Sequence, residues 1–598
     1  MREQPCAGRA ARTTIYLDSA SPITRLISRN RRRRPRETTV AVLVTRTRMS
    51  ADTALRRRAA CAQSPATATG IGRLDHRYQT VIVGGGPVGL ALAVSLGSRG
   101  IRCALVETRA AMHSIPKGQN LTQRTLEHFH FWGIADALRH ARLMPPSAPI
   151  GEITAYRDLA GDYWHAPKGR ELVRPYYFQD NDRIPQYQME KVLREKLATL
   201  PGVDARFGWT ASALTHDDDG ARVTVADEHG RTEVLAGEYV VGCDGGNSLV
   251  REASGIERRG TDFDQLMALV VFRSRELHDR LQRFPPRSTY RVMHPDLEGY
   301  WQFFGRIDVG EGFFFHAPIS REANRDTFDF TAPMRRAAGF DFACTIDYAG
   351  FWQLRNAVAS RYRASRVFIA GDAAHTHPPY GGFGVNNGLE DAVNLGWKLA
   401  AKLQGWGGET LLESYSAERQ PVFRDVAEDF IAARIREDGE FLARYSPQRD
   451  RAAFERAWAE RESDTGRRVN RYEPNYEGSP VVAGPAGGVS SAHGDHSFAA
   501  RAGHHLAPQP LSSGRNVFEE LGPGFTLLGF DAPDDVDRIA VAARERKVPL
   551  TVIRDTRADG RAAYGCKLIL VRPDQFIAWT GDTAPQDAGS LIDRAAGR

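Results

Sequence analysis

Apolar and polar positions along this chain fall into short runs that predict alternating strands and helices. Residues 80–83 form a buried-strand pattern, a helix-like run covers 88–98, and a second strand ends at Glu107. Strand periodicity returns over 201–243 and is broken at 217–220 by an Asp-Asp-Asp-Gly turn, which indicates a hairpin. Strands that alternate with helices in this way favour an α/β fold.

The rest of the chain shows further patterns that divide it into domains. The expected elements are an amphipathic helix at 189–200, a β-rich block with many aromatic residues at 260–355, a long helix at 389–403, charged helix and loop at 430–480, a linker rich in Gly, Ala, Ser and His at 485–515, and strands at 550–553 and 568–579. A chain of 598 residues is long enough for two or three such domains.

A glycine-rich loop follows the first predicted strand. Gly84 permits a tight turn, Gly86 lets the backbone approach a pyrophosphate, and Gly89 lets the helix at 88–98 pack closely on the strand. The amino end of that helix would face the phosphates, and Glu107 would accept hydrogen bonds from ribose hydroxyls while repelling a 2′-phosphate. The loop therefore predicts the adenosine half of FAD or NAD, rather than NADP. The competing interpretation is a glycine-rich turn without a ligand.

A second signature stands almost three hundred residues downstream. Asp372 follows an apolar strand at 367–370, where its carboxylate would accept a ribityl hydroxyl of FAD. The segment 375–388 contains two adjacent prolines and several glycines, which let the backbone lie against a flat ring. The amino end of the helix at 389–403 would stabilise an anionic reduced flavin. Together the two signatures predict an FAD site assembled from distant segments.

Metal and disulfide chemistry find little support in the sequence. His375 and His377 suggest a metal site, but further ligands at a fitting spacing do not follow, so we expect no metal. The six cysteines are scattered without a Cys-x-x-Cys pair, which fits a reducing cytoplasm.

The net charge of +7 is concentrated at the amino terminus. Residues 1–76 contain sixteen Arg, no Lys and five acidic residues, so this segment carries +11 and the remainder −4. The segment has the composition of a nucleic-acid arm or a transit peptide, but we favour a disordered Arg-rich extension that begins upstream of a start at Met49. We therefore expect no nucleic-acid partner. Membrane spans are not expected, because apolar runs stay far below the length of a bilayer.

A third motif makes the pattern specific. Residues 238–251 again read as strand, turn and helix start, with Asp244 and Gly245 in the turn. The dinucleotide loop, this Asp-Gly motif and the Gly-Asp motif at 371–372 occur in the order found in class A flavin-dependent aromatic monooxygenases, which share the p-hydroxybenzoate hydroxylase fold. The chain resembles that family over roughly residues 77–430.

The resemblance implies an α/β fold with three parts, namely a Rossmann-like FAD-binding domain, an inserted β-rich substrate domain and a thioredoxin-like C-terminal domain of the phenol-hydroxylase type. The implied boundaries are an extension at 1–76, the FAD-binding domain at 77–259 and 356–430 with part of the substrate region near 140–185, the substrate domain at 260–355, a helical segment and linker at 431–514, and the C-terminal domain at 515–598. Without a Cys-x-x-Cys pair, that last domain has a structural or dimer-supporting role rather than thiol chemistry.

The resemblance also assigns roles around the flavin. Pro379 would lie over the isoalloxazine ring, and the N–H groups of Val385 and Asn386 would bind its C2 oxygen. The other residues implied to contact FAD are Lys117, Arg124, Gln186, Asp244, Gly245 and Gly384, of which Lys117 replaces an arginine that is usual in the family. For Asp244 an alternative is a turn cap paired with Arg251. The sheet formed by 260–355 would roof the substrate pocket, although for each individual aromatic residue core packing is the better explanation.

The implied activity is hydroxylation of a phenolic or other electron-rich aromatic substrate through a flavin C4a-hydroperoxide, with NADH or NADPH and O₂ as co-substrates. The candidate catalytic residues are Pro379, Tyr380 and His316. The resemblance allows a homodimer. Alternatives are a Baeyer–Villiger-type or ring-modifying oxygenase on a polycyclic substrate and, from a different class, a nucleic-acid-associated protein with a vestigial flavin fold. The Trp-x-Trp-x-Ile-Pro segment of flavin halogenases is absent from the sequence.

Overall fold

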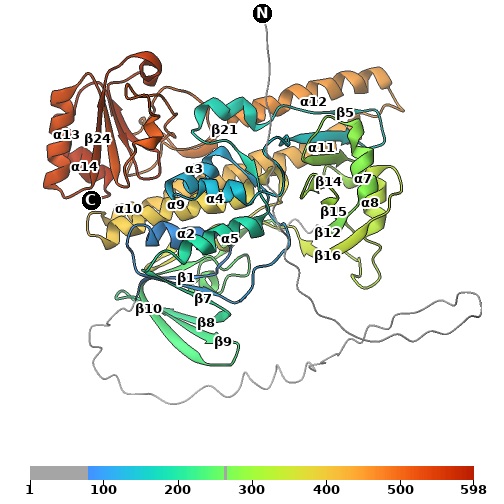
Figure 1. Cartoon of the computed structure of the whole chain (residues 1–598), viewed down its shortest axis with the longest axis horizontal. Coiled ribbons are helices and arrows are strands. Elements are labelled where there is room, and N and C mark those ends of the chain that lie inside the picture. The colour runs from blue at the N-terminus through green and yellow to red at the C-terminus, as the bar shows by residue number, and fades with distance from the viewer. Residues whose placement is uncertain (1–77, 262–264) are drawn as a thin grey trace, which may run out of the picture. The chain divides into compact units, whose positions relative to one another are not determined.

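The computed structural model describes residues 78–261 and 265–598, and its first sheet is built around the strand that precedes the glycine-rich loop (Figure 1). β1 (Tyr78–Val83) pairs in parallel with β2 (Cys103–Glu107) and with β10 (Thr232–Gly242), and β10 pairs in parallel with β19 (Val367–Ile369). The other strands of this eight-stranded sheet are β7 (Val203–Phe207), β8 (Trp209–His216), β9 (Ala221–Asp227) and β18 (Arg363–Ala364). The predicted hairpin at 217–220 joins β8 to β9.

The register of this sheet aligns the three sequence motifs. Val83 at the end of β1 pairs with Gly242 at the end of β10, and Gly242 pairs with Ile369 at the end of β19. Carboxyl ends of parallel strands meet at one edge of a sheet, where α/β proteins bind ligands. Three loops that are far apart in sequence therefore start side by side.

Helices cover this sheet and place their own ends near the same edge. α2 (Pro87–Gly97) packs against α5 (Gln186–Leu197) and α9 (Phe383–Leu403), and α10 (Glu409–Asp425) packs along α9 (Figure 1). The shorter helices of this region are α3 (Gln123–Phe131), α4 (Ala135–His140) and α6 (Leu249–Ala253). α9 begins six residues before the predicted position 389, so part of the predicted loop is its first turn.

A second sheet holds most of the aromatic residues. Its strand order is β16-β12-β15-β14-β13-β4-β5, and neighbouring strands are antiparallel except for β13 and β4. The strands are β4 (Glu152–Tyr156), β5 (Trp164–His165), β12 (Leu266–Arg273), β13 (Thr289–Met293), β14 (Trp301–Arg306), β15 (Gly312–Ile319) and β16 (Thr345–Gln353). Side chains from α7 (Arg275–Arg280) and α8 (Thr331–Ala338) join its core. The sheet thus includes strands from the region near 140–185 as well as from 260–355.

Two small pairings connect these parts. β11 (Arg258–Thr261), β17 (Asn356–Ala359) and β20 (His375–Thr376) form a three-stranded sheet. β3 (Asn120–Leu121) pairs with β6 (Asp182–Arg183). β20 and β3 follow strands of the first sheet, whereas β11 and β6 are adjacent in sequence to strands of the second sheet. Both pairings therefore connect the two sheets.

The segment predicted as helix and linker is more ordered than its composition indicated. A π-helical turn (Val426–Ala432) leads from α10 into α11 (Ala433–Arg444), which is followed by α12 (Arg451–Arg471). β21 (Tyr472–Tyr476) then pairs with β22 (Ser490–His493). The segment predicted as a linker contains β22, and its buried His504 bonds both Glu473 and Glu477 at 2.8 Å. The glycine and alanine content of the segment gave no indication of these contacts.

The C-terminal sheet has the strand order of a thioredoxin-like fold. β23 (Phe525–Phe530) and β24 (Leu550–Asp555) are parallel and joined by α13 (Pro533–Glu545), whereas β25 (Leu568–Val571) and β26 (Ile577–Gly581) are antiparallel and precede α14 (Ala588–Ala595). The order is β24-β23-β25-β26. This sheet belongs to the same compact unit, residues 73–598, as the two larger sheets. The predicted α/β fold class is confirmed.

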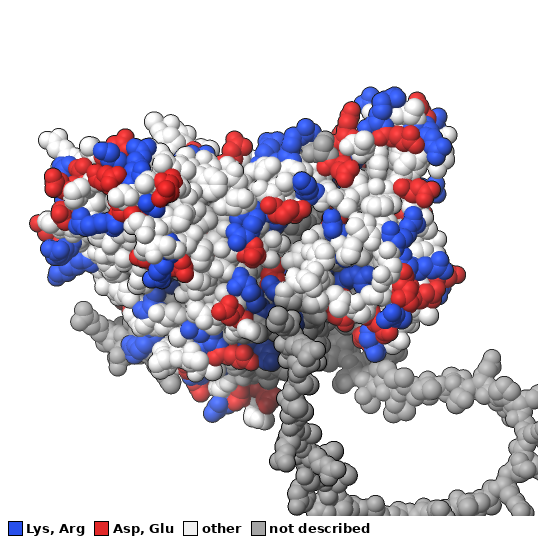
Figure 2. Space-filling view, turned by 45° about the horizontal axis from the view of Figure 1, so that its top comes forward, with Lys and Arg blue, Asp and Glu red and all other residues white. Residues whose placement is uncertain are grey.

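On the face visible in Figure 2, lysine and arginine side chains lie among aspartate and glutamate side chains. The basic excess of the sequence falls on residues 1–76, which lie outside the described residues together with the predicted extension. Within residues 78–261 and 265–598, none of the helices is both long enough and apolar enough to cross a bilayer.

Candidate active site

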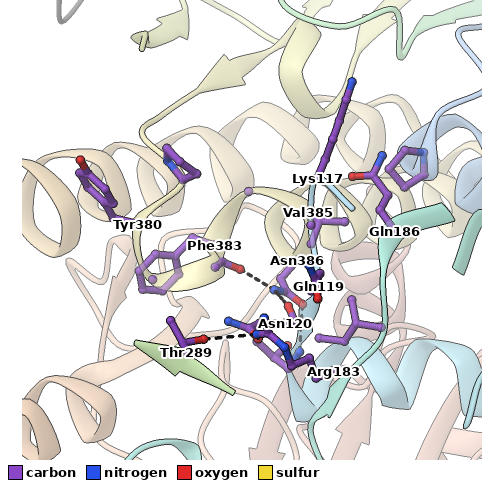
Figure 3. Close-up of a pocket in the computed structure, with 18 of the residues that line it drawn as sticks. Lys117, Gln119, Asn120, Arg183, Gln186, Thr289, Tyr380, Phe383, Val385 and Asn386 are labelled. Carbon is purple, nitrogen blue, oxygen red and sulfur yellow. Dashed lines mark hydrogen bonds between the residues drawn. The ribbon is translucent and has the colours of Figure 1, made fainter. Parts of the chain in front are cut away.

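A cavity of about 700 Å³ lies where the three aligned loops face the second sheet. Its wall contains Gly86 after β1, Gly245 after β10 and Asp372 after β19. Phe303 of β14 and Phe314 of β15 line it from the other side. Figure 3 shows further lining side chains, from residues 117–120, from 183–186, from β13 and from the start of α9, around one space. The register of the first sheet therefore brings distant motifs to one site.

The three glycines of the first loop have the geometry that the sequence predicts. Gly84 has a φ of +103°, and a Cβ there would overlap the carbonyl group of Cys243. A Cβ on Gly89 would overlap the carbonyl oxygen of Gly84, so the helix could not approach. Gly86 differs from both, because a Cβ would meet nothing within 4 Å and the residue borders the cavity. The space beside Gly86 suits a pyrophosphate at the amino end of α2.

Glu107 sits at the end of β2 with its carboxylate fixed beside the loop. Its Oε2 accepts a hydrogen bond from the Gly85 N–H at 2.7 Å, and its Oε1 accepts one from the Arg109 N–H at 2.9 Å. Each carboxylate oxygen can accept more than one hydrogen bond. Since Glu107 also lines the cavity, it can accept further bonds from ribose hydroxyls.

Asp244 caps its turn, as the alternative interpretation has it. Its carboxylate accepts hydrogen bonds from the Ser248 hydroxyl at 2.5 Å and the Val250 N–H at 3.1 Å. Burial raises the pKa of Asp244. Arg251 does not pair with it and instead donates to the carbonyl oxygens of Gly246 and Ala373. Gly245 borders the cavity whereas Asp244 lies behind it, so Asp244 shapes the loop and the backbone faces the ligand space.

Asp372 faces the cavity directly. Its carboxylate makes no hydrogen bond or ion pair with any residue in the described part of the chain, and burial raises its pKa. The side chain is nevertheless accessible from the cavity, so its two oxygens are free to accept hydrogen bonds from a ligand. The position therefore suits a hydroxyl-bearing ligand.

The amino end of α9 also points its free groups at the cavity. Gly381 and Gly382 both have left-handed backbones, with φ of +76° and +70°, and Phe383 begins the helix directly after them. Side-chain capping is absent from this helix start, so the N–H groups of its first turn have no partner inside the helix. Gly384 and Val385 belong to that turn and line the cavity. The positive end of the helix dipole and the free N–H donors together can stabilise a negative charge at this side of the cavity.

Asn386 fastens this helix end to the segment at 120–125. Its amide Nδ2 donates to the carbonyl oxygen of Asn120 at 2.8 Å (Figure 3). Its Oδ1 accepts from the Thr122 N–H at 3.0 Å and from the Thr125 hydroxyl at 2.6 Å. The neighbouring Gly118 approaches both Val385 and Gln186. Three segments thus lock together around the start of α9.

Gln119 is a cavity residue that the sequence analysis missed. Its side chain is 5% exposed, and neither amide atom has a hydrogen-bond partner. It lies between Lys117 and Asn120 in Figure 3, and both neighbours line the cavity with it. Lys117 and Gln186 line the cavity as expected, and Gln186 donates to Glu190 at 2.8 Å. Nothing in the residue pattern marked Gln119, because an amide has no characteristic spacing.

Arg124 does not line the cavity, and this placement disagrees with its predicted contact to FAD. Its guanidinium bonds Glu390 of α9 at 3.2 Å and the carbonyl oxygen of Asp574 in the C-terminal domain at 2.6 Å. It also bonds Gln575 at 2.8 Å. Hydrogen bonds between an arginine and a carboxylate are among the strongest in proteins, and none of these acceptors lines the cavity. Arg124 therefore connects domains.

His375 and His377 have separate surroundings. His375 bonds Asp391 at 2.6 Å, and His377 uses its Nδ1 at the Pro378 carbonyl oxygen at 2.5 Å. In the described residues, groups of three or more side chains suited to hold a metal ion were not found.

The second sheet divides its aromatic residues between the cavity and its own core. Side chains along β15 alternate, so Phe313 and Phe315 pack in the core while Phe314 and His316 face the cavity. Trp301 and Phe303 of β14 face the cavity as well. Only some of the aromatic residues of this sheet therefore line the cavity, and the others pack in its core.

The two predicted catalytic side chains of this region differ in what they can do. Burial lowers the pKa of His316 to about 4, its Nδ1 has no partner, and its ring stacks on Phe303 at 5.1 Å between centroids. The Tyr380 hydroxyl accepts a hydrogen bond from the Trp301 N–H at 3.1 Å, and burial raises its pKa. Neutral His316 can accept a hydrogen bond from a ligand, whereas the Tyr380 hydroxyl is already held by the backbone.

Taken together, the groups around the cavity fit FAD. Open space beside Gly86 suits a pyrophosphate, Asp372 suits a ribityl hydroxyl, and the donors at the start of α9 suit the carbonyl edge of the flat ring. The orphaned amide of Gln119 adds a donor and an acceptor within the same cavity.

Two family models match the sequence. The model described as FAD binding domain matches residues 77–429, and the model described as the C-terminal part of aromatic-ring hydroxylases matches residues 499–598.

Individual proteins agree with these models. Rifampicin monooxygenase of Streptomyces venezuelae is 30% identical over 515 residues, which cover 84% of this chain and 96% of that protein. The 4-methyl-5-nitrocatechol 5-monooxygenase of a Burkholderia species is 30% identical over 555 residues, which cover 87% of this chain and 97% of that protein. The structure of the rebeccamycin biosynthetic enzyme RebC with reduced flavin has a TM-score of 0.74 at 29% identity and covers 87% of this chain and 99% of that one.

Proposed function

The chain belongs to the family of FAD-dependent aromatic-ring hydroxylases, and from that membership we propose that it inserts one oxygen atom into a phenolic ring held between the start of α9 and the aromatic face of the second sheet. The chain is a flavin-dependent monooxygenase that uses FAD, a reduced nicotinamide nucleotide and O₂. The observation that carries the substrate position is the single cavity that joins the Gly86 loop to Phe303 and Phe314.

The chemistry that FAD supplies when bound is the transfer of two electrons from the nicotinamide to O₂, so that one oxygen atom enters the ring and the other leaves as water. The residues that would hold it divide by position. Gly86, Gly245 and Glu107 would hold the adenosine and pyrophosphate half, and Asp372 the ribityl chain. The first-turn N–H groups of α9 would hold the carbonyl edge of the ring.

The protein must also keep water from the reacting atoms. Trp301, Phe303 and Phe314 present apolar surfaces to the cavity, and Pro379 borders it from the α9 side. A phenol between these walls would be shielded from solvent, which strengthens every electrostatic interaction in the site. The walls support an aromatic substrate and a reaction that is sensitive to water.

His316 would orient the substrate rather than ionise it. With a pKa of about 4 it is neutral at physiological pH and accepts a hydrogen bond through a ring nitrogen. A group of such low basicity removes a phenolic proton poorly. We therefore assign His316 to positioning the substrate hydroxyl. The Burkholderia relative is named for a nitrocatechol, and nitrophenols ionise readily without an enzymic base.

The test is aerobic oxidation of NADH and of NADPH by the FAD-loaded protein with phenols, hydroxybenzoates, nitrocatechols and polycyclic phenols. We expect one class to stimulate oxidation and to give a product heavier by one oxygen atom, labelled when ¹⁸O₂ is used. Oxidation that yields only hydrogen peroxide with every class would contradict the proposed substrate type. A labelled lactone or ester in place of a phenol would show a Baeyer–Villiger reaction and overturn hydroxylation.

A further inference from the structure

Two guanidinium groups lie against the ring of Trp301 at the substrate end of the cavity. The Cζ atom of Arg291 is 3.6 Å from the ring centroid, and that of Arg434 is 5.1 Å from it. Arg291 comes from β13 and Arg434 from the start of α11, and all three residues line the cavity. This wall therefore carries more positive charge than an aromatic pocket needs for packing.

The acidic side chain in this cluster is already engaged by other groups. One oxygen of the buried Asp438 carboxylate accepts from Arg291 and from the Trp301 Nε1–H at 2.6 Å, and the other accepts from Arg461. Glu152 is the second acidic neighbour of Arg291, at 3.9 Å. Asp438 and Glu152 thus balance Arg291 and Arg461.

Arg434 has no acidic residue in direct contact in the described part of the chain, and Asp438 and Glu152 attract it only at longer range. Within residues 78–261 and 265–598 its guanidinium makes neither a hydrogen bond nor an ion pair, and it lies over the Trp301 ring. Burial, and then the charge of Arg291, lower its pKa to about 10, so it remains protonated at neutral pH. The Arg434 side chain is half-buried in the cavity wall, and its guanidinium offers five donors in a plane that matches a carboxylate.

Arg434 and Trp301 lie next to the place where the substrate ring would react. The Trp301 ring packs on the Tyr380 ring with 4.2 Å between centroids, and Tyr380 follows Pro379 in the loop that leads into α9. Phe430 lines the cavity one turn before Arg434. A multi-ring aromatic molecule that lies along this wall would reach Arg434 with one end and the Pro379 loop with the other.

We propose that Arg434 binds an anionic oxygen of the substrate, a carboxylate or phenolate group, so that this enzyme acts on anionic aromatic compounds. The proposal rests on the proposed function and deepens it by naming the charge of the substrate. The pyrophosphate of the nicotinamide nucleotide has similar chemistry, and the experiment below separates the two sources.

The test uses the FAD-loaded full chain and the pair 6-hydroxy-2-naphthoate and its methyl ester as probes, with binding followed by the change in flavin absorbance. In the wild type the anion should bind at least about tenfold more tightly than the ester. Arg434→Gln should weaken binding of the anion by roughly 10- to 100-fold, which is the range expected for hydrogen bonds to a charged group, and leave the ester unchanged. Arg434→Lys should restore part of the preference.

The matched control is Arg436→Gln, which removes an exposed arginine from the same helix and should change neither constant. Equal binding of anion and ester by the wild type, or an unchanged anion constant in Arg434→Gln, would overturn the proposal. A raised KM for NADH or NADPH in Arg434→Gln, without weaker naphthoate binding, would assign the group to the nucleotide instead. Because binding is read without turnover, failure of this proposal is distinct from failure of the hydroxylation assay.

Discussion

Arg572 of the C-terminal domain donates two hydrogen bonds to Glu418 of α10, at 2.8 and 2.9 Å, and both side chains are fully buried. Lys398 of α9 donates to the same carboxylate at 2.6 Å, and Asp574 accepts from Trp397 of α9 at 2.8 Å. The loop after β25 is therefore bonded to α9, whose first turn lines the cavity, and to α10, which packs along α9. Although burial opposes ionisation of Glu418, Arg572 and Lys398 hold its pKa below the usual range.

Removing this connection should destabilise the FAD-binding domain as well as the C-terminal domain. Arg572→Met leaves two buried carboxylates, Glu418 and Asp574, short of a partner, and breaking one side of a buried ion pair typically costs about 3–5 kcal/mol. We expect urea to unfold the variant in a single transition at a lower concentration than the wild type. Intrinsic fluorescence and flavin release should report the same midpoint.

The control is Arg554→Met, which breaks an exposed pair with Asp537 in the same C-terminal domain. Exposed pairs contribute little, so its unfolding curve should match that of the wild type. If Arg572→Met released flavin at the same urea concentration as Arg554→Met, the C-terminal loop would not support the FAD site.

Most of the architecture could be predicted from the alternation of strand and helix patterns along the sequence. The pattern at 80–107 predicted β1, α2 and β2, and the three motifs predicted adjacent loops, because apolar runs and glycine turns are local features. The start of α9 was placed too late, because Gly381, Gly382 and Gly384 read as loop residues although only the first two have left-handed backbones. The preference of glycine for loops is a weak guide when a helix start must approach a ligand.

The features that could not be predicted from the sequence depend on contacts between residues that are far apart in the chain. Arg124 was assigned to FAD by motif, but its partners Glu390 and Asp574 lie 266 and 450 residues away. Gln119 and Arg434 belong to no motif, and they stand out because each lines the cavity without a hydrogen-bond or ion-pair partner in the described part of the chain. A missing partner can be recognised only when every neighbour is in place.

Gly86→Val should abolish FAD binding while leaving the fold intact. A side chain at this position meets no protein atom within 4 Å but would fill the space where the pyrophosphate is expected. We expect protein that is purified without yellow colour, has a far-UV spectrum equal to that of the wild type, and does not bind added FAD in a fluorescence-quenching titration.

Gly161→Ala serves as the comparison, because its Cβ would make ordinary contacts in a turn away from the cavity. That variant should retain the full flavin content. Normal FAD affinity in Gly86→Val would place the pyrophosphate elsewhere.

Gln119→Leu should affect the apoprotein and the holoprotein in opposite directions. The amide is buried without partners, so replacing it by an apolar side chain of similar size should leave the apoprotein as stable as the wild type or more stable. If the amide contacts bound FAD, the same change should weaken FAD affinity by roughly tenfold, since one to two neutral hydrogen bonds are lost. Apoprotein melting and FAD titration measure the two effects separately. A variant with lower apoprotein stability and unchanged FAD affinity would assign Gln119 to the fold.

Stability should fall in mild acid because His316 is buried in its neutral form. Its pKa is about 4 in the folded protein and 6.5 in an unperturbed side chain, so between these values the unfolded chain binds a proton that the folded protein does not. The free energy of unfolding is therefore fully present above about pH 6.5 and decreases as pH falls toward 4, by at most about 1.4 kcal/mol per pH unit from this residue. His316→Gln removes the titrating group and keeps a polar side chain of similar size. Urea unfolding of FAD-loaded wild type and variant at pH 7.5, 6 and 5 should give a smaller decrease for the variant. If both proteins lost stability in parallel, His316 would be accessible to protons in the folded state, and its assignment as a neutral hydrogen-bond acceptor at the substrate would be wrong.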